Sequence, residues 1–284
     1  MQMYPKKIPT PDAPFPGKLR VGLGGEGVLR TTSRHADARA VIETAFAEGI
    51  RYFDSAVAYA GSQGYYGEFW QEHQQQRNQS FLTSKSAART YTGAMADLEL
   101  SLATLNTDHL DLWQVHDLRT DQDLLEVEKP GGALRAFMEA KETGVVRYMG
   151  ATGHADPGVL AHAVEYWPID TVLMPVNPVE VMPGGFLETI MEPAKNHGIR
   201  VIGMKTLGAG HYLFPESGIS AEVLVRFALA QQVDQVIVGC STREEVRALV
   251  TAGRAGPLGE EEADRLAAVF LPHAAAFAYY RSQV

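Results

Sequence analysis

Residues 19–54, LRVGLGGEGVLRTTSRHADARAVIETAFAEGIRYFD, read as a strand, a helix and a second strand. Apolar residues dominate 19–24, recur at helical spacing through 35–49, and gather again in RYFD at 51–54. Gly49 stands at the end of the helical stretch, where glycine commonly ends a helix. Alternation of short strands with helices predicts the repeating unit of a parallel sheet.

The same alternation continues along the chain without a linker or a charge run. Further strands are expected at 81–85, 111–116, 145–153, 171–178, 200–205 and 235–240, with helices at 65–77, 92–105, 132–144, 157–167, 187–198, 220–232 and 242–253. Eight such units favour a closed barrel, since a doubly wound open sheet usually has fewer strands. We therefore predict one α/β domain over residues 1–284, a single (β/α)8 TIM barrel with a C-terminal helical tail from about residue 257.

Composition argues against several classes of protein. Hydrophobic residues make up 45% of the chain and charged residues 21%, which is ordinary for a globular protein. The formal net charge of −9 argues against nucleic-acid binding, which needs a basic face. Cys240 is the single cysteine, so neither an internal disulfide nor a cysteine-based metal cluster is expected. Because the chain shows neither a secretory signal nor a run of about 18 apolar residues, we expect a cytoplasmic protein without a membrane partner.

Four polar residues stand at the ends of strand candidates, the positions that carry catalysis in barrels of this type. Asp54 and Tyr59 follow RYF, Lys85 follows FLTS, and His116 follows DLWQV. An ammonium group at Lys85 would lower the pKa of Tyr59, and Asp54 would hold that ammonium group in place. His116 would donate a hydrogen bond to a substrate oxygen. Together these residue types predict a proton-donating site for carbonyl reduction, with the hydride coming from a cofactor.

Each of the four also has an ordinary structural explanation. Tyr59 can simply pack in a loop, Lys85 can be solvated, and Asp54 can cap a turn. His116 can be a hydrogen-bonded histidine of the barrel. Their joint occurrence at neighbouring strand ends favours the functional interpretation.

The chain resembles an aldo-keto reductase from about residue 19 to about residue 255. The segments that carry the resemblance are FDSAVAYAGS at 53–62, FLTSKS at 81–86, LDLWQVHDL at 110–118 and GALRAFMEAKETGVVRYMGATGH at 132–154. By this resemblance Tyr59 is the general acid, tuned by Lys85 and Asp54, and His116 orients the carbonyl group. The segments GATGH, MPVNP and GMKTLGAG are similar to those of a subgroup of this family that often carries a C-terminal cysteine cluster. This chain lacks such a cluster.

The cofactor site is expected near strands 7 and 8, because the glycine-rich GLGGEG at 22–27 lacks the context of a dinucleotide-binding motif. Lys205 lies in VIGMKTLGAG, and Arg243 follows VGCST before a helix whose N-terminus favours an anion. A capped helix with a solvated Arg243 is the equally weighted alternative. The resemblance implies that these segments hold NADP(H), with Arg243 at the 2′-phosphate. NAD(H) is less favoured, although Glu244 or Glu245 facing a ribose hydroxyl would suit it.

The expected cofactor-binding residues are Gly24, Gly25, Thr152, Gly153, Lys205, Leu207, Gly239, Ser241, Thr242 and Arg243. Two of them depart from the family pattern, because GATGH stands where Gly-Val-Ser-Asn is common. Thr152 keeps a hydroxyl, whereas Gly153 offers no amide. The usual glutamine of strand 6 is also absent, and Leu173 or Met174 is expected to fill its site with an apolar group.

Substrate-facing residues are expected on the loops around the barrel mouth. Val28, Tyr66 and His154 are the candidates, with His154 either compensating for the lost amide or serving as a polar loop residue. Residues 117–130 form the longest connection and are a candidate pocket wall. Glu26 and Arg30 are expected to form a simple surface pair.

The leading hypothesis is an NADP(H)-dependent reductase acting on a small-molecule aldehyde or ketone. A cofactor-binding regulatory subunit with little turnover is a second hypothesis, and elimination or epimerisation through a transient ketone is a third. A metal-dependent hydrolase is disfavoured because the chain has no His-x-His pair, so no metal site is expected. Oligomeric state stays open.

Overall fold

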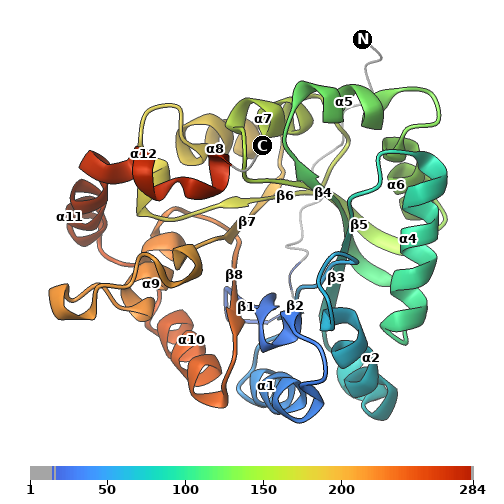
Figure 1. Cartoon of the computed structure of the whole chain (residues 1–284), viewed down its shortest axis with the longest axis horizontal. Helices are drawn as coiled ribbons and strands as arrows, with labels where there is room; N and C mark the ends of the chain where they lie inside the picture. The colour runs from blue at the N-terminus through green and yellow to red at the C-terminus, as the bar shows by residue number, and fades with distance from the viewer. Residues whose placement is uncertain (1–14, 16, 283–284) are drawn as a thin grey trace.

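Eight parallel strands pair in chain order, and β8 pairs with β1, so the sheet closes on itself. The strands are β1 (Val21–Gly27), β2 (Tyr52–Phe53), β3 (Phe81–Ser86), β4 (Leu110–Leu118), β5 (Val146–Gly153), β6 (Thr171–Pro175), β7 (Arg200–Met204) and β8 (Gln235–Cys240). This computed structural model, which describes residue 15 and residues 17–282, confirms the predicted (β/α)8 barrel (Figure 1).

Helices surround the barrel between successive strands (Figure 1). They are α1 (His35–Ala47), α2 (Ser62–Glu72), α3 (Gln74–Arg77), α4 (Tyr91–Thr104), α5 (Asp121–Glu128), α6 (Ala133–Glu142), α7 (Pro157–Tyr166), α8 (Phe186–Asn196), α9 (Ala221–Ala230), α10 (Arg243–Ala255), α11 (Glu260–Phe270) and α12 (Ala274–Phe277). Short 3₁₀ helices include η1 (Val28–Arg30), η2 (Pro178–Val181) and η3 (Gly208–Gly210). Within the described residues no helix is both long and apolar enough to cross a membrane.

Two expected elements differ in detail. The helix expected at 65–77 is divided into α2 and α3 at His73, whose φ of −130° and ψ of 54° are not helical. The connection at 117–130 contains α5, which begins after Thr120. The Thr120 hydroxyl accepts from the N–H of Asp123, and the Asp123 carboxylate accepts from the N–H of Thr120, forming a capping box.

The inside of the barrel is packed with apolar side chains. They are Tyr52, Phe81, Leu112, Leu173, Ile202 and Ile237. Phe15 packs edge-on against this layer, with ring centroids 5.4 Å from Tyr52 and 5.3 Å from Phe81. Leu173 therefore belongs to the barrel filling and Met174 to the outer core, so neither fills a site at the mouth, contrary to the expectation. Side chains alternate across a strand, which puts these two on opposite faces.

Candidate active site

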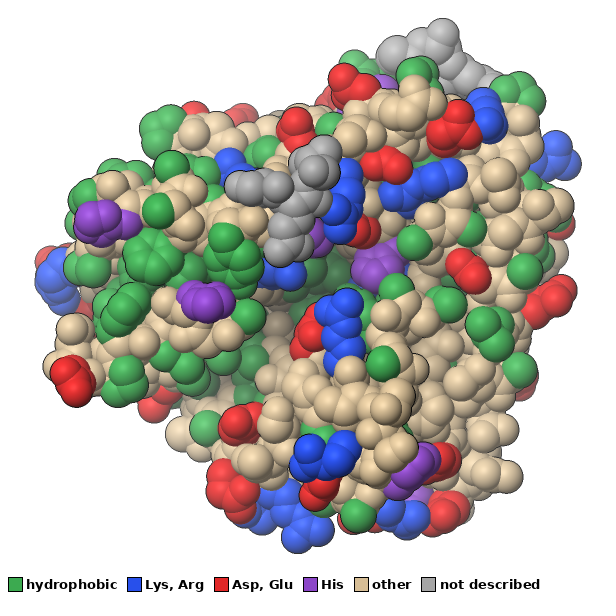
Figure 2. All heavy atoms as spheres, viewed as in Figure 1, with side chains coloured by type: hydrophobic (Ala, Val, Ile, Leu, Met, Phe, Trp, Pro, Cys, Tyr) green, Lys and Arg blue, Asp and Glu red, His purple; other side chains and the backbone are tan. Residues whose placement is uncertain are grey.

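A hollow opens at the centre of the molecule, with basic, acidic and histidine side chains around it (Figure 2). It lies at the C-terminal ends of the strands. Asp54 follows β2, Lys85 lies near the end of β3, and His116 lies near the end of β4. Tyr59 lies in the turn between β2 and α2.

Lys85 and Asp54 form a buried ion pair beneath this hollow. Lys85 Nζ lies 2.5 Å from Asp54 Oδ2 and also donates to the carbonyl oxygen of Ser55 at 2.8 Å. Thr83 donates to Asp54 Oδ1 at 2.8 Å, so both carboxylate oxygens accept hydrogen bonds. Burial lowers the pKa of Lys85, with Asp54 acting in the opposite direction. The carboxylate therefore fixes the ammonium group in place.

The ring of Tyr59 lies against this pair and against His116. Lys85 Nζ is 4.7 Å from the centroid of the Tyr59 ring. The ring of His116 stands nearly perpendicular to that of Tyr59, with centroids 5.5 Å apart. Backbone hydrogen bonds from Tyr59 to Ala56 and from Ser62 to Tyr59 close the turn that carries the phenol. The structure thus brings the four candidate side chains together.

The electrostatics at Tyr59 differ from the expectation. Burial raises the pKa of Tyr59 well above its ordinary value, and the carboxylates of Asp54 and Glu26 act in the same direction. Arg30, whose guanidinium carbon lies 5.1 Å from the ring centroid, lowers the pKa of Tyr59. The direction is opposite to the lowered value that the sequence predicts, because burial dominates and the nearby carboxylates add to the rise.

His116 is a neutral imidazole in this environment. Burial, followed by the charge of Lys85, lowers the pKa of His116 to about 3. Its Nδ1 atom is buried and has no hydrogen-bond partner among the described residues. A neutral imidazole carries one N–H, so His116 can donate a hydrogen bond to an oxygen without adding charge to the site.

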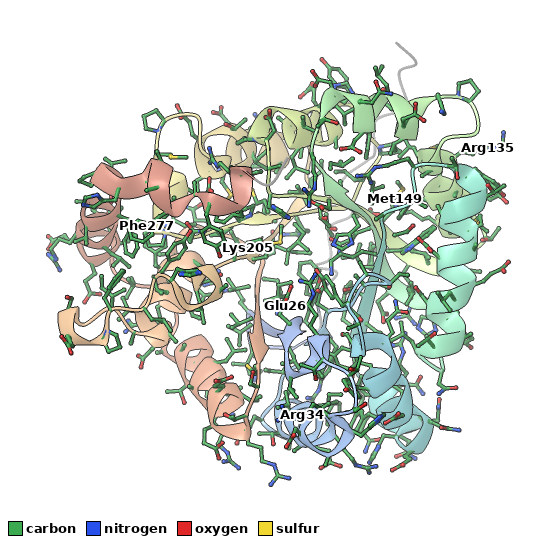
Figure 3. All side chains as sticks on the ribbon, viewed as in Figure 1. Glu26, Arg34, Arg135, Met149, Lys205 and Phe277 are labelled. Atoms are coloured by element: carbon green, nitrogen blue, oxygen red, sulfur yellow. The ribbon has the colours of Figure 1, made fainter. Side chains whose placement is uncertain are left out.

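Lys205 extends the site toward β7. Figure 3 shows Lys205 and Glu26, from different sides of the barrel, both directed toward its centre. Burial lowers the pKa of Lys205, while the charges of Glu26 and Asp117 raise it and that of Arg30 lowers it. Lys205 has no ion-pair partner within the described part of the chain, so its ammonium group is available to an anion.

The loop after β7 is a tight turn. Lys205, Gly208, Ala209 and Gly210 have positive φ angles of 55°, 54°, 52° and 92°, and the N–H of Gly208 donates within the turn to the carbonyl oxygen of Lys205 at 3.1 Å. The hydroxyl of Thr206 is buried and lacks a hydrogen-bond partner among the described residues. Leu207, between these residues, accepts a hydrogen bond from the N–H of Gly210 at 2.9 Å. A cation beside an unpartnered hydroxyl fits a phosphate group.

The N-terminus of α10 is capped by its own residues. Thr242 accepts from the N–H of Glu245 at 3.2 Å, and the Glu245 carboxylate accepts from the N–H of Ser241 at 2.6 Å. Arg243 is exposed and has no ion-pair partner within the described residues, whereas Glu244 pairs with Arg247. Arg243 is therefore the cation at this end of the helix that remains available to a ligand.

Three candidate cofactor glycines allow β1 to approach its neighbours closely. A Cβ atom on Gly25 would lie 2.6 Å from Tyr59 Cδ2, and one on Gly24 would lie 3.0 Å from the backbone nitrogen of Gly239. A Cβ atom on Gly239 would lie 2.5 Å from Glu26 Cβ. Close packing thus already requires glycine here, and cofactor contact at these three positions stays a prediction.

The candidate residues at the end of β5 contact other residues of the protein. The Thr152 hydroxyl accepts from the N–H of Asp117 at 2.9 Å, and a Cβ atom on Gly153 would lie 2.9 Å from the carbonyl oxygen of Leu118. His154 lies between Asp117, with Nε2 to Oδ1 at 3.1 Å, and the carbonyl oxygen of Tyr280, with Nδ1 to O at 3.3 Å. The ring of His154 is therefore held on both sides.

Two residues expected to face the substrate are in the core instead. Tyr66 is fully buried, and its ring packs edge-on against Phe53 and stacks near Trp70. Val28 is 2% exposed and belongs to the main hydrophobic cluster. The aromatic stripe of α2 faces the barrel wall, which explains why Tyr66 does not reach the mouth.

Sequence reasoning missed the contacts of the C-terminal tail. Glu180, fully buried in η2, accepts hydrogen bonds from the hydroxyl of Tyr280 and from Arg281. Asn177 Nδ2 donates to the Tyr280 hydroxyl at 3.1 Å. The sequence signal for these contacts is Glu180, the single carboxylate in the apolar segment VNPVEV, because a buried charge needs a partner.

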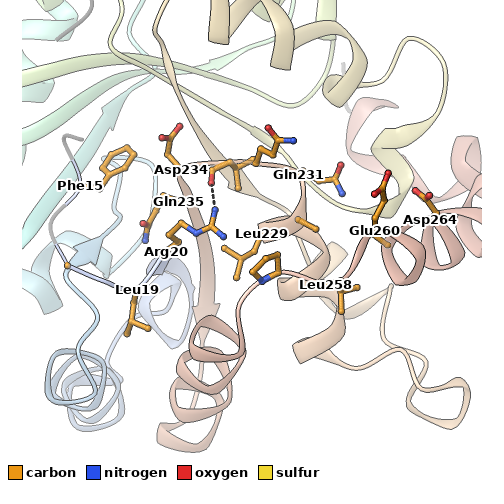
Figure 4. A pocket seen from close by; sticks show the side chains of 16 residues that line it. Phe15, Leu19, Arg20, Leu229, Gln231, Asp234, Gln235, Leu258, Glu260 and Asp264 are labelled. Atoms are coloured by element: carbon orange, nitrogen blue, oxygen red, sulfur yellow. Dashed lines mark hydrogen bonds between the residues drawn. The ribbon is translucent and has the colours of Figure 1, made fainter. Parts of the chain in front are cut away.

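A cavity of about 830 Å³ lies at the opposite end of the barrel (Figure 4). Its lining includes Arg20 and Gln235 at the starts of β1 and β8, and Glu260 on α11. Arg20 donates to the carbonyl oxygen of Val233 at 3.3 Å. None of the four candidate catalytic residues lines this cavity, so its volume does not mark the reactive site.

The chain is similar to known oxidoreductases. The model of the Aldo/keto reductase family matches residues 19–214, more than half of the chain. An uncharacterized oxidoreductase of Bacillus subtilis, YqkF, is 24% identical over 307 aligned residues, covering 92% of this chain and 94% of that protein. A D-galacturonate reductase of Fragaria ananassa is 26% identical over 206 residues, covering 66% of this chain and 62% of that protein.

Solved structures share the fold. The holo form of an aldo-keto reductase from Bacillus halodurans has a TM-score of 0.73 at 20% identity, covering 89% of this chain and 95% of that one. An aldo/keto reductase from Klebsiella pneumoniae, solved in complex with NADP and acetate, has a TM-score of 0.72 at 20% identity, covering 88% and 91%. On the match of the family model, the chain belongs to the aldo/keto reductase family.

Proposed function

We propose that this protein is an NADP(H)-dependent reductase that converts a small-molecule aldehyde or ketone to an alcohol, with Tyr59 as the general acid. The observation that carries the proposal is the arrangement around the phenol. Tyr59 lies 4.7 Å, from ring centroid to Nζ, from a lysine that Asp54 fixes, and its ring meets the neutral His116 at 5.5 Å. These are a proton donor, a cation that favours the phenolate, and an uncharged hydrogen-bond donor.

In this mechanism the substrate oxygen lies between the phenol of Tyr59 and the imidazole of His116. His116 donates a hydrogen bond that orients and polarises the carbonyl group, and its low pKa keeps it from competing as an acid. When bound, NADPH would supply the hydride for the carbonyl carbon. The O–H bond of Tyr59 breaks as its proton passes to the developing alkoxide, and Lys85 stabilises the phenolate that remains. Alcohol oxidation uses the same groups in reverse.

The residues of this chain fit a phosphorylated dinucleotide. Lys205 and the unpartnered hydroxyl of Thr206 would hold the pyrophosphate, and Arg243 would meet the 2′-phosphate. The guanidinium of Arg243, which has no ion-pair partner among the described residues, favours NADP(H) over NAD(H), because an adenosine ribose without a phosphate offers it no anion. The Klebsiella pneumoniae relative solved with NADP supports the same preference.

The test is NADPH consumption by the purified protein with para-nitrobenzaldehyde. We expect Tyr59→Phe to lower kcat by about 100- to 10,000-fold, because it removes the acid but keeps the ring. Tyr166→Phe is the matched control, since that tyrosine is exposed on α7. NADPH binding is measured separately by equilibrium dialysis. Binding without turnover would reject the reductase and favour the regulatory alternative, and loss of binding would reject the cofactor assignment.

A further inference from the structure

Arg30 and Glu26 form a second ion pair beside Tyr59. The guanidinium carbon of Arg30 lies 5.1 Å from the centroid of the Tyr59 ring, and Arg30 Nη1 lies 2.5 Å from Glu26 Oε1. Sequence reasoning treats this pair as an ordinary surface pair. Arg30 nevertheless places its charge over the ring of the candidate acid.

The chain holds Arg30 firmly at this position. Gly27 has a φ of 68°, and a Cβ atom there would lie 2.5 Å from the carbonyl oxygen of Cys240, so β1 turns into η1 where only glycine fits. Val28 and Leu29 are buried, and Thr31 closes the 3₁₀ turn by donating from its hydroxyl and its N–H to Val28 O. The backbone that carries Arg30 is therefore anchored in the core, although its guanidinium is at the surface.

Two cations with separate counter-ions thus contact one phenol ring. Lys85 is buried and pairs with Asp54, whereas the side chains of Arg30 and Glu26 are 48% and 50% exposed. A cation over an aromatic face is attracted by the electron density of the ring. The attraction increases when the phenol loses its proton, because negative charge then spreads over the ring.

We propose that Arg30 is a positioning residue of the reaction, which acts through Tyr59 by stabilising the phenolate that proton transfer leaves behind, and that Glu26 moderates this effect. The inference rests on the proposed reductase function. Arg30 does not need to touch the substrate for this role. It differs from Lys85 in being solvent-exposed, so its influence must weaken at high ionic strength, whereas that of the buried pair persists.

The charged and titratable groups that face Tyr59 come from several elements. They are Glu26 on β1, Arg30 on η1, Asp54 after β2, Lys85 on β3, and His116 and Asp117 on β4. Burial raises the pKa of Tyr59 and the carboxylates add to that rise, while Arg30 opposes it. Loss of Arg30 should therefore leave the acid weaker, and loss of the Glu26 charge should leave it stronger.

The experiment compares Arg30→Gln, Arg30→Lys and Glu26→Gln with the unmodified protein. Arg34→Gln is the matched control, because Arg34 is an exposed arginine four positions further on, paired with Asp37, and directed away from the mouth (Figure 3). Oxidation of para-nitrobenzyl alcohol by NADP⁺ is followed from about pH 7 to about pH 11. In this direction Tyr59 must accept a proton, so the rate depends on its deprotonated form and rises with pH. Aldehyde reduction at neutral pH and NADPH affinity are measured on the same variants.

For Arg30→Gln we expect the rising limb of the oxidation rate to move to higher pH and kcat for reduction to fall on the order of threefold at low salt. Arg30→Lys should restore most of the rate, and Glu26→Gln should move the limb to lower pH. Thermal stability should stay unchanged, and Arg34→Gln should match the unmodified protein. Added salt should shrink the difference caused by Arg30.

A pH profile that Arg30→Gln leaves unchanged would overturn the inference. So would a loss confined to the KM of para-carboxybenzaldehyde, which would make Arg30 a contact for a substrate carboxylate instead. Either outcome leaves the reductase function intact, because the unmodified protein still turns over. Absence of turnover in the unmodified protein, in contrast, is failure of the proposed function itself.

Discussion

Lys85 Nζ and Asp54 Oδ2 lie 2.5 Å apart, and only 1% of either residue is exposed, so each charge depends on the other. Breaking a buried pair from one side costs about 3–5 kcal/mol, because the remaining charge is left without a partner. We expect Asp54→Asn and Lys85→Met each to lower the free energy of unfolding by about this amount.

The double variant D54N/K85M should be much less destabilised than the sum of the single variants, since it leaves no buried charge unpaired. Urea unfolding followed by circular dichroism measures all three. Strictly additive losses would mean that the two charges do not depend on each other in the folded protein.

The barrel and the strand-end residues could be predicted because their signals are local. Apolar periodicity gives each strand, and Asp54, Lys85 and His116 follow directly from the strand boundaries. The capping box at Thr120 is also a local signal, because Thr120 and Asp123 stand at the required spacing in the sequence. This spacing predicts a helix where α5 begins.

The remaining errors come from contacts between distant segments. The pKa of Tyr59 depends on Arg30, which lies in a different loop, and on how deeply the fold buries the ring. Tyr66 lies on a helix whose orientation against the barrel cannot be read from an aromatic stripe. Tyr280 meets Glu180 across 100 residues of chain, so only the folded structure reveals that pair.

His116 should make stability depend on pH. Its pKa is about 3 in the folded protein against an ordinary value of 6.5, so between these values only the unfolded chain binds the proton. The free energy of unfolding should therefore fall as pH drops from about 6.5 toward about 3. In His116→Gln this part of the pH dependence should disappear, as measured by urea unfolding at several pH values. Equal slopes in both proteins would mean that His116 is not buried as a neutral group.

Arg243 should select the phosphorylated cofactor. It is exposed and has no ion-pair partner among the described residues, and a charge-assisted hydrogen bond to phosphate contributes more than a neutral one. Arg243→Gln should weaken NADPH binding by about 10- to 100-fold and leave NADH binding unchanged. Arg247→Gln is the control on the same helix, since Arg247 already contacts Glu48 and Glu244. Equal weakening of both cofactors would place the 2′-phosphate elsewhere.

The Tyr280 hydroxyl should hold the C-terminal tail in place. It donates to Glu180 Oε1 and accepts from Asn177, so Tyr280→Phe removes one hydrogen bond from each and leaves the buried Oε1 atom without its partner, at a cost of about 1–3 kcal/mol. We expect faster amide hydrogen exchange in α12 in this variant. Tyr279→Phe is the neighbouring control, because no hydrogen bond of its hydroxyl is seen within the described residues. The same acceleration in both variants would show that the hydroxyl of Tyr280 is not the anchor.

Gly25 should be indispensable because any side chain there would push against the ring of Tyr59. A Cβ atom there would lie 2.6 Å from Tyr59 Cδ2 and 2.9 Å from the carbonyl oxygen of Asp54, and the backbone oxygen cannot move away. Gly25→Ala should therefore displace the phenol and lower kcat by about 100-fold or more, the range lost when a general acid is misplaced.

Gly64→Ala is the matched control, because its Cβ atom would meet no atom within 4 Å on α2. That variant should keep full activity, and unfolding should show a stability gain of up to about 1 kcal/mol, since alanine favours a helix over glycine. Full activity in Gly25→Ala would mean that the ring of Tyr59 can shift without loss of function. The close approach of β1 to the acid would then be packing alone.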